Sequence, residues 1–308
     1  MWKKLLLGMI LTALILWVYI KVTNVNITVL FKLPPYVIAA SVIFMFLADF
    51  VRSIRLKILS EYVKAPLSFK ESFIIWEASR LLAIMTPGFY GGELLRIGYI
   101  AKKYDLSKAI AINILELTSE SVGLGINAVT AFTLLLLLRP PNVTIDPLVF
   151  PTLIALGISS FGIAVTFTRK CPQRFGHRVY KMCKSIVEAL STAGINAFGI
   201  AVLISTIGVA LYSFSFGVIS SYLVHRGVLG TLIFVCSLPI TAFPITPGGI
   251  GLPEAIATLS LPALASSLAT WRILNLLTVS TMSITTTVLG GLLNVNIRNI
   301  QVSKAEEP

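Results

Sequence analysis

The sequence TPGFYGGELLR at residues 86–96 breaks an apolar segment with a proline and three glycines, and then places Glu93 and Arg96 three positions apart. A second stretch, TPGGIGLPE at residues 246–254, repeats this pattern of turn residues followed by an acid, with one extra residue. Each stretch follows one apolar run of helical length and precedes another. The pair predicts two broken helical hairpins that dip into a membrane and return.

The composition is typical of a membrane protein. Of the 308 residues, 56% are hydrophobic and 12% are charged, and the mean hydropathy is +0.89. A soluble domain carries about 25% charged residues. We therefore expect an all-α polytopic membrane protein with a single transmembrane domain over 1–308. Uncharged runs long enough to cross a bilayer predict about six spanning helices, and the re-entrant hairpins add two further segments: spans at 5–20, 33–51, 111–138, 148–168, 197–224 and 270–293, hairpins at 69–100 and 228–268.

The distribution of Lys and Arg predicts the orientation of these spans. With the N-terminus in the cytoplasm, the inner loops hold 18 of the 25 basic residues, Arg52 and Arg55 among them. The remaining seven lie in outer loops (Lys21, Lys32, Arg139, Arg226) or in membrane segments (Arg80, Arg96, Arg272). This is the positive-inside pattern, and it explains the net charge of +12 without a nucleic-acid partner. We expect a multi-pass protein of the cell membrane with both termini in the cytoplasm.

In this topology the two hairpins enter the membrane from opposite sides. The halves of the chain, about 1–140 and 148–295, then form an inverted repeat, as in transporters that hold a substrate near the membrane midplane on broken helices. Irregular backbone is tolerated at membrane depth only where it is buried in protein or lines a polar cavity. The breaks therefore predict a shared cavity. The alternative is a chance similarity between two turn sequences.

Several acidic residues fall in the predicted membrane segments. A charge near the bilayer centre costs about 2.5–3.5 kcal/mol on insertion scales, so such residues usually face the interior of a helix bundle and are candidates for function. Asp49 is expected instead to form an interfacial ion pair, because it lies beside Arg52 and Arg55. Six of the thirteen acids are in this position: Asp49, Glu77, Glu93, Glu116, Glu120 and Glu254.

Glu93 and Arg96 would lie on one face of a helix that starts after the glycines. In one interpretation Glu93 caps that helix, where the helix dipole favours an anion, and pairs with Arg96. In the other, Arg96 and Arg80 bind a lipid phosphate, and Glu93 holds the guanidinium in place. Arginine suits this role because its planar fork binds phosphate in a bidentate manner.

Two further sets of charged residues can each be interpreted in more than one way. Glu116 and Glu120 lie on one helix face and repel each other if both are ionised, so one is protonated or both face a cation. They could also form a structural polar seam. Glu254 mirrors Glu93 in the second half, with Arg272 as its basic partner, unless Arg272 extends to the membrane surface.

The chain resembles the lysylphosphatidylglycerol synthase transmembrane-domain family, which consists of flippase-like integral membrane proteins. The segments that carry the resemblance are RSIRLKIL (52–59), TPGFYGGELLR (86–96), ELTSE (116–120), TPGGIGLPEA (246–255) and WRIL (271–274). In the family similar domains precede an aminoacyltransferase domain, which this sequence lacks. The resemblance thus implies handling of lipids and argues against lysyl transfer by this chain.

The third motif departs from the family pattern. The family often has Glu-Arg-x-x-Asp where this chain has Leu117 in place of the arginine and Glu120 in place of the aspartate. This difference weakens any specific role that the resemblance would assign to Glu116 and Glu120.

We expect a lipid translocator that moves an anionic phospholipid or a polyisoprenyl-phosphate-linked glycolipid between leaflets. The glycines of the two motifs would let the backbone approach the head group, since no Cβ intervenes. The candidate substrate-binding residues are Arg80, Pro87, Gly88, Gly91, Gly92, Glu93, Arg96, Glu116, Glu120, Pro247, Gly248, Gly249, Gly251, Glu254 and Arg272.

Two other functions remain open at this stage. One is an intramembrane enzyme acting on lipid phosphates, with a divalent cation bound by Glu93, Glu116 and Glu120. The other is a non-catalytic partner that docks a soluble transferase through a basic amphipathic segment at 169–192 on the cytoplasmic side. The chain ends in a polar tail at 296–308. We predict no catalytic residue, metal or cofactor, because only two histidines, no CxxC pair and no Walker loop are present.

Overall fold

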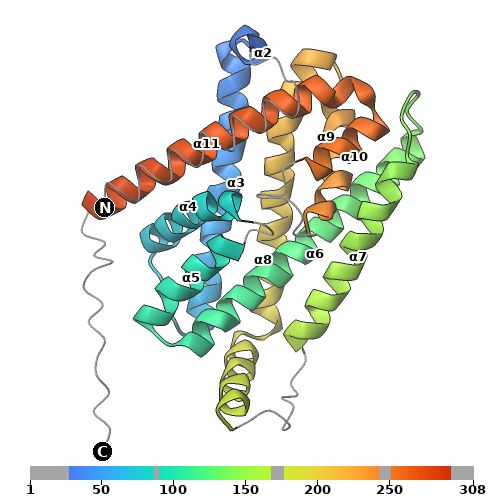
Figure 1. Cartoon of the computed structure of the whole chain (residues 1–308). Helices are drawn as coiled ribbons and strands as arrows, with labels where there is room; N and C mark the ends of the chain where they lie inside the picture. Colours follow the sequence, from blue (N-terminus) through green and yellow to red (C-terminus); the bar gives the residue numbers. More distant parts are fainter. Residues whose placement is uncertain (1–27, 87–89, 168–176, 243–250, 293–308) are drawn as a thin grey trace, which may run out of the picture.

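The computed structural model describes residues 28–86, 90–167, 177–242 and 251–292, and its secondary structure there is entirely helical. The helices are arranged as in Figure 1, where α3 and α8 run side by side and α11 crosses them obliquely. Their bounds are α2 Thr28–Lys32, α3 Pro35–Tyr62, α4 Phe69–Met85, α5 Tyr90–Lys103, α6 Leu106–Leu138, α7 Asp146–Phe167, α8 His177–Val224, α9 Gly227–Ser237, η1 Leu238–Ala242, α10 Leu252–Ser260, η2 Pro262–Leu264 and α11 Ala265–Leu292.

Four of the described helices are long and apolar enough to cross a membrane: Pro35–Tyr62, Leu106–Leu138, Asp146–Phe167 and Tyr180–Val224. They correspond to the predicted spans at 33–51, 111–138, 148–168 and 197–224. The span predicted at 5–20 lies outside the described residues. The span predicted at 270–293 is a helix, α11, but it is not among these four. The multi-pass membrane architecture is therefore confirmed, whereas the count of six spans is not.

The end of α3 differs from the prediction in a way that matters for function. Pro34 is the N-cap of this helix and Pro35 its first residue, where a missing N–H costs no hydrogen bond. The helix then continues to Tyr62 without a break. Arg52 and Arg55 are thus helical residues and not the loop residues that the charge pattern indicates; Arg55 is buried and Arg52 is partly buried.

The first predicted hairpin is formed by α4 and α5, which pack against each other. Ser68 and Glu71 start α4 with a capping box, because each side chain accepts a hydrogen bond from the other residue's backbone N–H. After α4 ends, the Thr86 hydroxyl accepts a hydrogen bond from the Gly91 N–H at 2.8 Å. Gly92 lies so close to the α4 backbone that a Cβ there would come within 2.6 Å of the Ser79 carbonyl oxygen. Gly91 and Gly92 therefore allow the tight approach of the two helices.

The second predicted hairpin comprises α9, η1 and α10. Gly251 precedes α10 with a φ of 97°, in the left-handed region that glycine adopts without strain. Its N–H donates to the Glu254 carboxylate at 2.8 Å, so Glu254 caps the start of α10. Residues 243–250 lie outside the described part of the chain, and the re-entrant path predicted for both hairpins stays a prediction.

A break within α8 separates two segments of different composition. Gly194 has φ 70° and ψ 179°, which is not helical, and so it ends one helix and starts the next. The segment before it, from His177, contains the described part of the basic stretch predicted at 169–192. The segment after it is an apolar helix that packs along α3 and α6.

The interior combines aromatic packing with close helix contacts. Trp271 of α11 packs edge-on against Phe234 of α9 with ring centroids 4.8 Å apart, and Phe216 of α8 joins this cluster. Gly123 of α6 faces Ser205 of α8, where a Cβ on the glycine would lie 2.7 Å from the serine Cβ. Small residues at such crossings let two membrane helices approach closely. This contact keeps α6 and α8 near enough for their polar side chains to meet.

Substituting Gly123 with valine is expected to force α6 and α8 apart and to destabilise the protein by about 1–3 kcal/mol, the usual cost of overpacking. The measurement is the thermal unfolding temperature of the detergent-purified variant. Gly157→Val in α7 is the matched control, because a Cβ at Gly157 meets nothing within 4 Å. Equal unfolding temperatures for the two variants would contradict the close contact.

Candidate functional site

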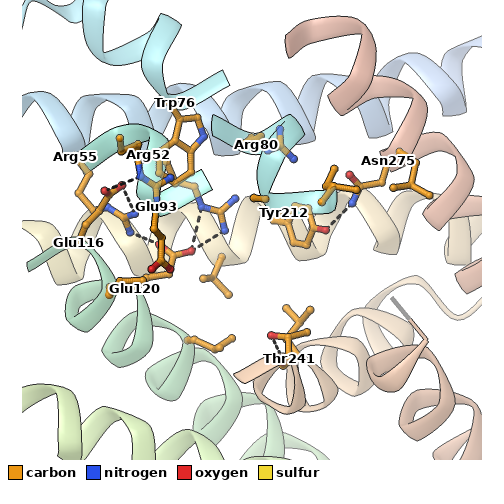
Figure 2. Close-up of a pocket in the computed structure, with 18 of the residues that line it drawn as sticks. Arg52, Arg55, Trp76, Arg80, Glu93, Glu116, Glu120, Tyr212, Thr241 and Asn275 are labelled. Carbon is orange, nitrogen blue, oxygen red and sulfur yellow. Dashed lines mark hydrogen bonds and ion pairs between the residues drawn. The ribbon is translucent and has the colours of Figure 1, made fainter. Parts of the chain in front are cut away.

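A cavity of about 360 Å³ lies between α3, α4, α5, α6, α8, η1 and α11. Its walls therefore come from both predicted hairpin regions and from three of the long helices. Figure 2 shows that most of the labelled charged side chains gather on one side of it: Arg52, Arg55, Glu93, Glu116 and Glu120. The residues that carry polar or aromatic groups into the cavity are Arg52, Arg55, Trp76, Arg80, Glu93, Arg96, Glu116, Glu120, Tyr212, Thr241, Arg272 and Asn275.

The concentration of arginine distinguishes this cavity from an ordinary helix interface. Five guanidinium groups line it, and Arg55 is only 1% exposed and Arg272 only 6%. Buried charges are tolerated when they are paired and hydrogen-bonded. Each of the five meets at least one carboxylate, and the arrangement of these pairs determines what a ligand in the cavity would encounter.

Two arginines of α3 face two glutamates of α6. Arg52 donates to Glu120 through Nη2 at 2.9 Å and Nε at 3.1 Å. Arg55 contacts both Glu116, at 3.2 Å, and Glu120, and it also donates to the Ser205 hydroxyl at 2.5 Å (Figure 2). Glu116 and Glu120 thus both face cations, which are the protein's own arginines, and this arrangement fits the polar seam between packed helices as well.

Arg96 also pairs with Glu116. Its Nε lies 3.3 Å from the Glu116 carboxylate, and its Nη1 donates to the Ser79 hydroxyl at 3.1 Å. The guanidinium stacks over the Trp76 ring at 4.8 Å from the centroid. In one interpretation Glu93 pairs with Arg96, but in the structure the ion-pair partner of Arg96 is Glu116 of α6. Glu93 lines the cavity and hydrogen-bonds the side chain of Asn113.

Arg80 of α4 is paired with Asp49 of α3. Asp49 is 1% exposed and also accepts a hydrogen bond from the Trp76 indole at 3.3 Å, while Arg52 is more distant, at 3.9 Å. The expected ion pair with Arg52 is present only as this longer contact, Arg55 pairs with Glu116 and Glu120 instead, and Asp49 is buried. The helix α3 extends beyond Asp49, which places this acid inside the bundle and next to α4.

Glu254 and Arg272 form the pair that was predicted for the second half of the chain. Arg272 Nε donates to the Glu254 carboxylate at 2.5 Å, and both residues are buried. Extension of Arg272 to the membrane surface is therefore excluded in this structure. The pair links the start of α10 to α11, and Arg272 also reaches the cavity.

The structure separates the remaining candidates into two groups. Gly91, Gly92 and Gly251 form turns and close contacts and are not among the residues that line the cavity. Five further candidates lie outside the described residues: Pro87, Gly88, Pro247, Gly248 and Gly249.

Sequence reasoning did not select Arg52, Arg55, Trp76, Tyr212 and Asn275 as site residues. Arg52 and Arg55 were assigned to a loop because their charges ended an apolar run. Their spacing of three was a usable signal, since it places them on the same helix face and Glu116 and Glu120 required cationic partners. Tyr212 and Asn275, joined by a 2.5 Å hydrogen bond, offered no comparable signal.

No cluster of three acidic, histidine or cysteine side chains in the described part of the chain is arranged to hold a metal ion. The carboxylates of Glu116 and Glu120, which one hypothesis assigned to a divalent cation, contact guanidinium groups instead.

These features define a multi-pass helical membrane protein with an arginine-rich cavity between its helices. The chain belongs to the family described as the lysylphosphatidylglycerol synthase TM region, whose model matches residues 5–296. The resemblance found in the motifs is thereby confirmed, and it covers most of the chain. No curated protein and no solved structure is significantly similar to this sequence.

Removing Arg55 is expected to leave Glu116 and Glu120 with too few cations and to cost about 3–5 kcal/mol, as for other broken buried pairs. Arg55→Met should therefore unfold at a much lower temperature than the wild type in detergent. Adding Glu116→Gln to this variant should restore part of the loss, because one of the uncompensated charges is removed.

Lys57→Met provides the control two residues further along α3. Lys57 pairs with Glu61 at 2.7 Å, but both side chains are exposed, so the expected cost is below about 1 kcal/mol. A loss as large in Lys57→Met as in Arg55→Met would contradict the structural importance of the buried network.

Proposed function

We propose that this protein is a lipid translocator that moves an anionic phospholipid or a polyisoprenyl-phosphate-linked glycolipid between leaflets. The observation that carries the proposal is the gathering of five arginines around one cavity in a membrane protein. Arginine is the side chain best suited to a phosphate at low dielectric, because its fork gives two parallel hydrogen bonds and its charge persists when buried.

The pairing of every arginine with a carboxylate supports transport in preference to permanent binding. A guanidinium that already has a carboxylate partner is stable in the empty cavity, and a lipid phosphate must displace that partner to bind. The net free energy of phosphate binding is then the difference between an arginine–phosphate and an arginine–carboxylate interaction. Because these two are similar, the phosphate can leave again. Release is as necessary as capture for a translocator.

The finer mechanism builds on the two hairpin regions. Arg80 and Arg96 come from α4 and α5, whereas Arg272 is held by Glu254 at the start of α10. We infer that the head group moves between these two sets of ligands while the acyl chains stay in the bilayer. Opposite insertion of the hairpins, as an inverted repeat in the cell membrane with cytoplasmic termini, would give access from each side in turn.

The test is leaflet exchange of fluorescent phosphatidylglycerol in reconstituted vesicles. Arg96→Ala is expected to slow exchange by about 10- to 100-fold, because a hydrogen bond to a charged group contributes about 1.5–3 kcal/mol. Arg96→Lys keeps the charge without the planar fork and is expected to fall between this variant and the wild type.

Arg226→Ala is the matched control, since Arg226 is exposed and lies outside the cavity. It should exchange lipid at the wild-type rate. Wild-type vesicles that exchange no anionic lipid faster than protein-free vesicles would refute the proposal, as would equal rates for Arg96→Ala and Arg226→Ala in folded protein.

A further inference from the structure

Glu77 is a buried acidic residue that does not line the cavity. It lies on α4 with 0% exposure, and neither of its carboxyl oxygens has a hydrogen-bond partner among the described residues. It does not line the cavity, although Arg80, three positions later on the same helix, does. A buried carboxyl group with a purely structural role normally accepts a hydrogen bond from a nearby donor.

The charged groups around Glu77 come from two helices. Asp49 of α3 and Arg80 of α4 act on it electrostatically, and these two are themselves an ion pair. From α5, Arg96 is directed to Ser79 and Glu116. From α11, the Ser283 hydroxyl donates to the Glu77 backbone carbonyl at 2.6 Å, and the one charged residue in the described part of α11 is Arg272, held by Glu254.

An ionised carboxylate in this position would have no donor and would lie beside the negative charge of Asp49. Burying such a charge without a partner costs far more than binding a proton, so the group is held as the neutral acid. Burial without a donor therefore favours the protonated form of Glu77, and Arg80 forms its ion pair with Asp49.

The spacing of Glu77 and Arg80 makes that proton relevant to the ligand. Residues three apart on a helix are neighbours on its surface, so an ionised Glu77 is a second carboxylate for the Arg80 guanidinium. When Glu77 is protonated, a phosphate competes with Asp49 alone for the Arg80 guanidinium. With Glu77 ionised, it competes with two carboxylates, and Arg80 is withdrawn from the cavity.

We propose that Glu77 is a proton-binding site whose proton is a co-ligand of the lipid phosphate, so that the anionic lipid and one proton move together. Proton binding at the Glu77 carboxylate favours phosphate at Arg80, and loss of the proton to water returns Arg80 to the carboxylates and releases the lipid. By linkage, phosphate binding strengthens proton binding to the same extent. This inference rests on the proposed lipid translocation.

The first test measures binding of short-chain phosphatidylglycerol to the detergent-purified protein as a function of pH. The wild-type affinity should fall as the pH rises through the titration of Glu77, by up to about tenfold per pH unit for one linked proton. Glu77→Gln imitates the protonated acid, and its affinity should stay at the wild-type acidic value across this range. Identical pH dependence in the two proteins would overturn the inference.

The second test applies a pH gradient across reconstituted vesicles. Wild-type protein should accumulate fluorescent phosphatidylglycerol in one leaflet beyond an even distribution, whereas Glu77→Gln should only equalise the leaflets. Glu61→Gln, an exposed acid on α3, should behave as the wild type. Wild-type exchange that ignores the gradient would refute proton coupling while leaving the translocator intact. No exchange at all would refute both.

A third measurement does not depend on transport. Infrared difference spectroscopy of the wild type against Glu77→Gln should reveal the carbonyl stretch of a protonated carboxylic acid, lost in the variant. Glu77→Gln should also fold with at least wild-type stability, because the amide replaces a neutral group. Absence of this band, with a carboxylate signal in its place, would show that Glu77 carries no proton.

Discussion

The network between arginines of α3, α4 and α5 and carboxylates of α3 and α6 is the interaction on which the site depends. Arg55, Glu116 and Glu120 form its centre, with Arg52 and Arg96 on either side. Charges at membrane depth are tolerated only when they satisfy one another. The same pairing also assembles the cavity, because the shorter ion pairs of the network join side chains of different helices.

Sequence reasoning identified the fold class and the acids because these depend on local properties. Hydropathy and the length of uncharged runs located α6, α7 and most of α8, since a bilayer imposes a minimum span. The pair Glu254–Arg272 could also be predicted, because the motif places the acid at a helix start and the arginine follows on the next long helix. Such features are encoded over short distances in the chain.

The partners of the other acids could not be predicted in the same way. The charges of Arg52 and Arg55 predict the end of a span and a loop, whereas α3 continues to Tyr62. Arg96 pairs with Glu116 and not with Glu93 because α5 packs against α6, which brings Glu116 to the guanidinium. Pairing across helices is a tertiary property, and the spacing within one helix does not encode it.

The charges around the cavity are balanced, and this balance affects the response to membrane voltage. In the described part of the chain, five arginines are matched by five carboxylates, those of Asp49, Glu93, Glu116, Glu120 and Glu254. An electric field does about 2.3 kcal/mol of work per elementary charge for each 100 mV crossed. A cavity without net charge feels no such force when empty. If a phosphate brings one proton with it, the loaded cavity is neutral as well, and the translocation cycle is electrically silent.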